Sequence, residues 1–125
     1  MIRPSKSLLI LGIEVFLLSF SIAFGEGNTS KEVTIKGTVI DPVCLITMGM
    51  KGEGHRECAT RCAKAGENLA IMDESGKIYT ILAEKPFTNP NGPVLNYIEK
   101  TVTVKGTLIE KGGVSYIVVK ETQGR

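Results

Sequence analysis

Two segments of the chain, far apart in sequence, are nearly identical. Residues 33–40 read VTIKGTVI and residues 102–109 read VTVKGTLI. Both alternate β-branched with polar residues, which is the pattern of a half-buried strand, and each has a central glycine, Gly37 or Gly106. A glycine inside a strand often marks a sharp bend or a bulge at the corner of a barrel. Because the match is a single pair, it indicates two strands with the same role and not a repeat array.

The segment between these two strands predicts one clear helix. Residues 55–65 (HRECATRCAKA) contain neither glycine nor proline and are followed by Gly66, the residue type that most often ends a helix. Residues 41–54 hold a proline and three glycines, and we expect them to be irregular. Residues 86–96 hold three prolines and predict a loop, with one short helical turn at residues 93–98.

Three further strands bring the predicted number to five. They are expected at residues 68–73, 77–83 and 114–120, in two hairpins that turn at residues 74–76 and 111–113. Five strands, two of them bent by glycine, favour a small closed barrel of the OB type, in which the first and fourth strands are neighbours. The predicted fold is therefore mainly β: a five-stranded OB-like barrel with one cysteine-bearing helix after the first strand. The alternative is a half-open sheet with a helix on it.

The N-terminus has the three parts of a signal peptide. Two basic residues precede an apolar run at residues 8–24, and small residues lie before a cleavage point after Gly25. Glu14 lies inside the apolar run, where a carboxylate is costly in a permanent membrane span. We expect residues 1–25 to be removed on export to the periplasm or beyond, leaving residues 26–125 as one OB-like domain. The alternative is an uncut N-terminal anchor, and no other contact with a membrane is indicated.

Metal-type ligands are concentrated in one short stretch. All three cysteines and the only histidine lie within residues 44–62. At about 100° per residue, His55, Cys58 and Cys62 share one face of the predicted helix, and Cys44 precedes them in a glycine-rich segment. Three thiolates and an imidazole hold zinc, and thiolates also suit monovalent copper.

We therefore predict a zinc or copper site. Its core is Cys44, Cys58 and Cys62, in which the last two residues are spaced to chelate one ion from neighbouring helical turns. His55 is the fourth ligand, or the hydrogen-bonding neighbour of a ligand. As a ligand it has to lie at the helix start with a non-helical backbone, because it is two turns away from Cys62.

Two other interpretations of the cysteines stay open. Disulfides persist outside the cytosol, so a bridge from Cys44 to Cys58 or Cys62 would staple the helix to the first strand and leave one odd thiol. A thiol oxidoreductase is the third interpretation, although three residues separate Cys58 from Cys62, where dithiol enzymes have two. We favour a binding module over an enzyme.

Asp41, directly before Pro42, has two interpretations. It could orient the ring of His55 as a carboxylate beside a metal ligand. The simpler interpretation is turn chemistry, because aspartate before proline commonly starts a turn.

A longer motif surrounds the candidate ligands. Asp41-Pro-Val-Cys44 is followed by His55-Arg-Glu-Cys58-Ala-Thr-Arg-Cys62 and, four residues on, by a glycine. The chain in this respect resembles a group of small exported bacterial proteins of unknown function. Their pattern is Asp-x-x-Cys, a glycine-rich gap, then His-x-x-Cys-Ala-x-x-Cys-x-x-x-Gly. The resemblance covers the order of elements from about residue 33 to 120. It implies an OB-like exported domain with a metal or redox site and no established activity.

The composition limits the classes of partner that we expect the protein to bind. The 125 residues include 15 Lys and Arg against 13 Asp and Glu, a net charge of +2, and no Trp. A basic face and a set of aromatic stacking platforms are what a nucleic-acid module needs, and neither is indicated. The expected partner is a metal ion or an unidentified periplasmic protein, and no nucleic acid.

Overall fold

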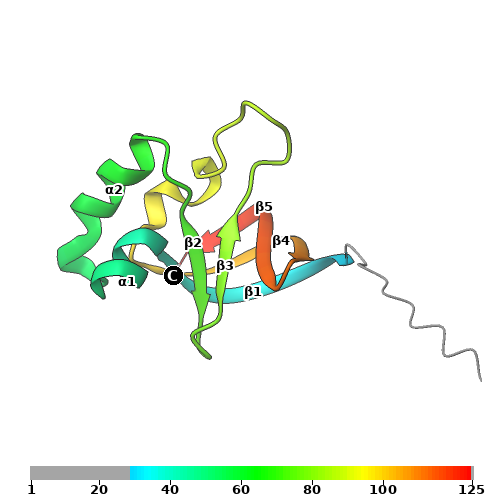
Figure 1. The fold of residues 1–125 in the computed structure, drawn as a ribbon, viewed down its shortest axis with the longest axis horizontal. Coiled ribbons are helices and arrows are strands. Elements are labelled where there is room, and N and C mark those ends of the chain that lie inside the picture. The colour runs from blue at the N-terminus through cyan, green and yellow to red at the C-terminus, as the bar shows by residue number, and fades with distance from the viewer. Residues whose placement is uncertain (1–28, 125) are drawn as a thin grey trace, which may run out of the picture.

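The computed structural model describes residues 29–124, which form a closed five-stranded barrel (Figure 1). The strands are β1 (Thr29–Ile40), β2 (Ala70–Asp73), β3 (Ile78–Ile81), β4 (Thr101–Lys111) and β5 (Val114–Gly124). They follow one another around the barrel in the order β1-β2-β3-β5-β4, and only β3 and β5 pair in parallel. The predicted OB-like barrel is therefore confirmed. The half-open sheet is not what forms, because β3 pairs with β5 and closes the ring.

The two similar segments lie side by side, since β1 pairs antiparallel with β4 over most of its length. In β4 the register against β5 shifts between Lys105 and Gly106, which is a β-bulge. A side chain at Gly106 would overlap the carbonyl of Val118. A Cβ at Gly37 would lie 2.5 Å from the carbonyl oxygen of Met72. Both glycines are thus required by the close approach of a neighbouring strand, and at Gly106 the predicted bulge is also present.

The connection from β1 to β2 is helical. It contains α1 (Pro42–Met48), the 3-10 turn η1 (Glu53–His55) and α2 (Arg56–Lys64). The helix expected at residues 55–65 is α2, whereas the prediction of irregular structure over residues 41–54 was wrong for α1.

Residues 42–48 form a helix because the sequence around them carries the signals for a helix start and a helix end. The Asp41 carboxylate accepts the N–H of Cys44, and Pro42 occupies the first turn, where its missing N–H is harmless. Gly49 ends the helix in the left-handed conformation at φ 67°. The glycines that suggested a loop are therefore the stop of one helix and the approach to the next.

The remaining connection runs from β3 to β4. It contains η2 (Gly92–Tyr97), a 3-10 helix that agrees with the short helical turn expected at residues 93–98. Its last residues lead back to the barrel through a bridge between Ile98 and Val39.

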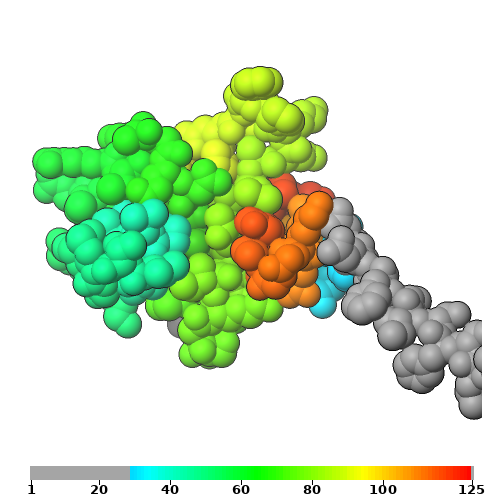
Figure 2. Space-filling model, in the orientation of Figure 1, coloured from blue at the N-terminus to red at the C-terminus, as the bar shows by residue number. Residues whose placement is uncertain are grey.

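The core fills the barrel and extends under α2. The largest fully buried apolar side chains are Ile40, Leu69, Ile71, Ile81, Ile98 and Ile117. From α2, Ala59 and Ala63 pack against this core, and their small size lets the helix lie close to the barrel. The two helices form a lobe at one end of the molecule, seen in cyan and green in Figure 2.

The expected signal peptide, residues 1–25, lies outside the described residues. Within residues 29–124, no helix combines the length and the apolar character needed to cross a membrane.

Candidate metal centre

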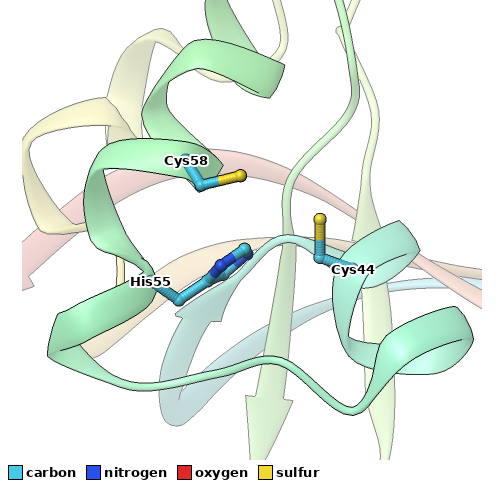
Figure 3. A group of neighbouring side chains, drawn as sticks. All are labelled: Cys44, His55 and Cys58. Carbon is cyan, nitrogen blue, oxygen red and sulfur yellow. The ribbon is translucent and has the colours of Figure 1, made fainter.

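The predicted ligands come from three neighbouring elements. Cys44 lies in α1, His55 is the last residue of η1, and Cys58 and Cys62 lie one turn apart in α2. The sulfurs of Cys44 and Cys58 and a ring nitrogen of His55 all lie within 4.8 Å of one another. Figure 3 shows the three side chains turned toward a common space between α1 and α2.

Cys62 belongs to a second group. Its sulfur, the Cys44 sulfur and a carboxylate oxygen of Asp41 also lie within 4.8 Å of one another. Cys44 is thus common to two groups, and Cys58 and Cys62 fall into different ones. We expected these two residues to chelate one ion together. In the structure they lie beside Cys44 from successive turns of α2, about 5.4 Å apart along the axis, and each belongs to its own group of donors.

The loop before His55 is held by a hydrogen bond to the segment that leads into β4. The N–H of Gly52, at the start of η1, donates to Glu99 Oε2 at 2.8 Å. His55 follows with φ −94° and ψ −7° and precedes the first residue of α2. His55 therefore lies at the helix start, as predicted, but its backbone is right-handed helical, in a 3-10 turn, and not the non-helical backbone that was expected.

The His55 ring is buried without hydrogen-bond partners. Its side chain is 3% exposed, and neither ring nitrogen has a partner among the described residues. The nearest carboxylate atom, Asp41 Oδ2, lies 4.0 Å from Nε2, which is too far for a hydrogen bond. Leaving a buried polar group unsatisfied costs about 1–3 kcal/mol, so a ligand for this ring would remove a real penalty.

The two carboxylate oxygens of Asp41 face different groups. Oδ1 accepts the N–H of Cys44 at 2.9 Å, so the expected turn chemistry is confirmed in the form of a helix cap. Oδ2 is buried and faces His55. The same carboxylate therefore stands where it can also orient the ring.

Glu67 lies against Asp41, and sequence reasoning missed it. Two ionised carboxylates offer only acceptors, so the buried Asp41 Oδ2 and Glu67 Oε1 have no donor. The hydrogen bond to Asp41, followed by burial, raises the pKa of Glu67, because a proton there bridges the two groups. Burial alone would raise the pKa of Asp41, but the hydrogen bonds from Glu67 and Cys44 outweigh it and lower that pKa.

The environment of two thiols opposes their ionisation. The hydrogen bond to Asp41, followed by burial, raises the pKa of Cys44 to about 12. Burial, followed by the hydrogen bond to Asp41, raises the pKa of Cys62 to about 11. The raised pKa disfavours the thiolate of each residue, which is the form that acts as nucleophile in a thiol oxidoreductase. All three cysteines are free.

No family model matches the chain, and no curated protein or solved structure matches it either. The resemblance to the exported bacterial group stays a prediction, and the site is interpreted from its own geometry.

Proposed function

We propose that this protein is an exported metal-binding module that holds zinc or monovalent copper at Cys44, His55 and Cys58. The observation that carries the proposal is the buried, unpartnered imidazole of His55 beside two thiols. Adjacent ligands of a tetrahedral zinc ion lie about 3.7 Å apart, given metal–sulfur bonds of about 2.3 Å. Donor atoms already within 4.8 Å of one another reach that spacing by small side-chain rotations.

The surroundings support His55 as a ligand. A histidine that binds a metal through one nitrogen usually donates its other N–H to a carboxylate, which fixes the ring. Asp41 Oδ2 is the carboxylate oxygen nearest to the ring, at 4.0 Å from Nε2. Small movements of the kind that metal binding requires would close this contact. Asp41 would then hold the ring while it caps α1.

Cys58 makes the site accessible. It is exposed, whereas Cys44 and His55 are buried. An ion bound here is held from the inside by a thiolate and an imidazole and meets solvent on the Cys58 side. This arrangement suits a protein that receives an ion from another molecule or passes it on. The proposed location, periplasmic or secreted or else anchored by an uncut N-terminus, rests on residues 1–25 alone.

The test is native mass spectrometry of the protein exported by an expression host and purified without chelator. We expect bound zinc or copper together with three reduced thiols. Cys44→Ser should lose the ion, and Cys58→Ser should weaken its binding at least tenfold without unfolding the protein, because Cys58 is exposed. Lys64→Ser, an exposed change on the same helix, is the matched control and should keep the ion.

Two results would overturn the proposal. A mass two hydrogens lighter with no metal would mean that the cysteines staple the fold as a disulfide. A fully reduced protein that takes up neither zinc nor monovalent copper on titration would mean that the cluster is not a metal site.

A further inference from the structure

The second group of donors is not used by the ion proposed above. Asp41, Cys44 and Cys62 bring a carboxylate oxygen and two sulfurs within 4.8 Å of one another. Glu67 adds a second carboxylate in contact with Asp41. This group lies on the Cys62 side of Cys44, one helical turn of α2 away from Cys58.

Among residues 29–124, the one basic side chain that pairs with this group is His55, whose Nε2 lies 4.0 Å from Asp41 Oδ2. The Asp41 side chain is fully buried, and its Oδ2 has no hydrogen-bond partner among the described residues. The same is true of the buried Oε1 of Glu67. Within residues 29–124, no lysine or arginine forms an ion pair with either carboxylate. Buried charges in proteins are paired or coordinate metals, so a cation can take the place of the proton that otherwise bridges Asp41 and Glu67.

Cys44 is placed to connect two ions. Its sulfur is the one donor within 4.8 Å of the members of both groups. A thiolate sulfur has enough lone pairs to bind two ions at once. Two ions that share ligands in this way lie about 3.5–4 Å apart, a distance that a single bridging sulfur can span.

We infer that the centre holds a second divalent cation, zinc, at Asp41, Cys44, Cys62 and Glu67, with the Cys44 sulfur bridging the two ions. The inference rests on the proposed function, since it adds a position to the same site. It explains why a buried oxygen of Glu67 meets the buried Asp41 carboxylate beside thiols. It also gives Cys62 a ligand role that does not require it to reach His55. The two positions differ in chemistry: the outer one is thiolate and imidazole, and the inner one adds two carboxylates.

The number of zinc ions bound per chain tests the inference. On titration with zinc, followed by native mass spectrometry, the full chain without its signal segment should saturate at two ions. Cys62→Ser should weaken binding of the inner ion and Cys58→Ser that of the outer ion, each at least tenfold, so that each variant holds one ion at zinc concentrations where the unsubstituted protein holds two. Glu67→Gln should weaken zinc binding only at the inner position, by tenfold or more. Glu57→Gln, which changes an exposed carboxylate on α2, should alter zinc binding at neither position.

The bridging of two ions by the Cys44 sulfur can be measured separately. Protein loaded with cadmium-113 should give two NMR resonances that are scalar-coupled through the shared sulfur. Saturation at one ion, with Cys62→Ser still binding one, would overturn the inference and leave the proposed function standing. Two uncoupled resonances would overturn the bridging role of Cys44. Failure of the unsubstituted protein to bind any zinc or copper would instead remove the proposed function itself.

Discussion

At the scale of single residues, Asp41 is the most informative position because one carboxylate caps α1 and faces His55. Asparagine caps helices about as well as aspartate but carries no charge. We therefore expect Asp41→Asn to keep the stability of the metal-free protein within about 0.5 kcal/mol, while its zinc affinity falls about 10- to 100-fold. Urea unfolding of the metal-free protein and competition with a colorimetric chelator measure the two quantities.

Asp41→Ala is the matched comparison. It removes the cap as well as the charge, so the metal-free protein should lose about 1 kcal/mol relative to Asp41→Asn. If both variants bound zinc as tightly as the unsubstituted protein, Asp41 would act only as a helix cap.

The candidate site could be predicted in part at this scale. Cys44, His55 and Cys58 stand out because all the soft ligands of the chain lie in one stretch, and the structure does bring these three together. That Cys58 and Cys62 join Cys44 in different groups depends on how α1 lies against α2, which helical periodicity does not encode. Glu67 carries no local signal. It comes after Gly66, whose φ of 105° turns the chain back toward Asp41, so only the folded chain places it in the site.

At the scale of elements, the β2–β3 hairpin has a titratable group that is separate from the metal centre. Asp73 Oδ1 accepts the hydroxyl and N–H of Ser75 and the N–H of Lys77, and Oδ2 accepts the Tyr79 hydroxyl. The Ser75 hydroxyl contributes most, and together these bonds outweigh burial and lower the pKa of Asp73. A lowered pKa means that the ionised form stabilises the fold. This contribution is complete above the unfolded-state value of about 3.9 and is lost as the pH falls through the lower folded value.

Asp73→Asn should therefore lower Tm by several degrees at pH 7, and the difference from the unsubstituted protein should shrink at pH 3. Thermal unfolding followed by circular dichroism at the two pH values measures this. Glu57→Gln, on the surface of α2, is the control for removing a carboxylate. A Tm difference that does not change with pH would show that the asparagine acts by altering turn geometry and not by removing a charge.

Element boundaries show where sequence reasoning succeeds and where it fails. β1 and β4 were recognisable because their alternation is strong, and β4 extends only one residue before and two residues beyond the segment 102–109. α1 was missed because Pro42 and the following glycines resemble loop composition, although Asp41 and Pro42 are also the start signal of a helix. A seven-residue helix with a single buried side chain offers little hydrophobic periodicity by which to resolve this ambiguity.

At the scale of the whole molecule, the barrel and the helical lobe differ in what holds them. The barrel encloses an extensive apolar core, to which α2 contributes Ala59 and Ala63. In α1, Cys44 alone is buried, while Ile46 is 70% exposed. The closed ring of strands could be foreseen from the two glycine-centred segments, because it depends on the strand pattern and on strands that bend or bulge at glycine. The attachment of α1 could not, because it depends on the side chains that meet around Cys44.

This difference predicts a local response to metal removal. An ion bound by Cys44 and by residues of η1 and α2 ties α1 to its neighbours, and a ligand that binds only the folded form stabilises what it holds. Chelation should therefore speed amide hydrogen exchange in residues 42–48 by tenfold or more, and leave β4 and β5 within about twofold of their rates with metal. Hydrogen exchange of the zinc-loaded and chelated protein, read by mass spectrometry on peptides from each segment, measures both.

Cys58→Ser separates the two proposed ions in the same experiment. It removes an outer ligand but leaves the Asp41, Cys44 and Cys62 group intact. With zinc present, α1 in this variant should exchange more slowly than in the chelated protein, because the inner ion still binds the Cys44 thiolate. If the amide exchange rates of α1 in the unsubstituted protein did not change on chelation, packing alone would hold the helix in place. Faster exchange throughout the barrel would mean that the metal stabilises the whole fold and not the lobe, since the β-strands contribute no ligand to either position.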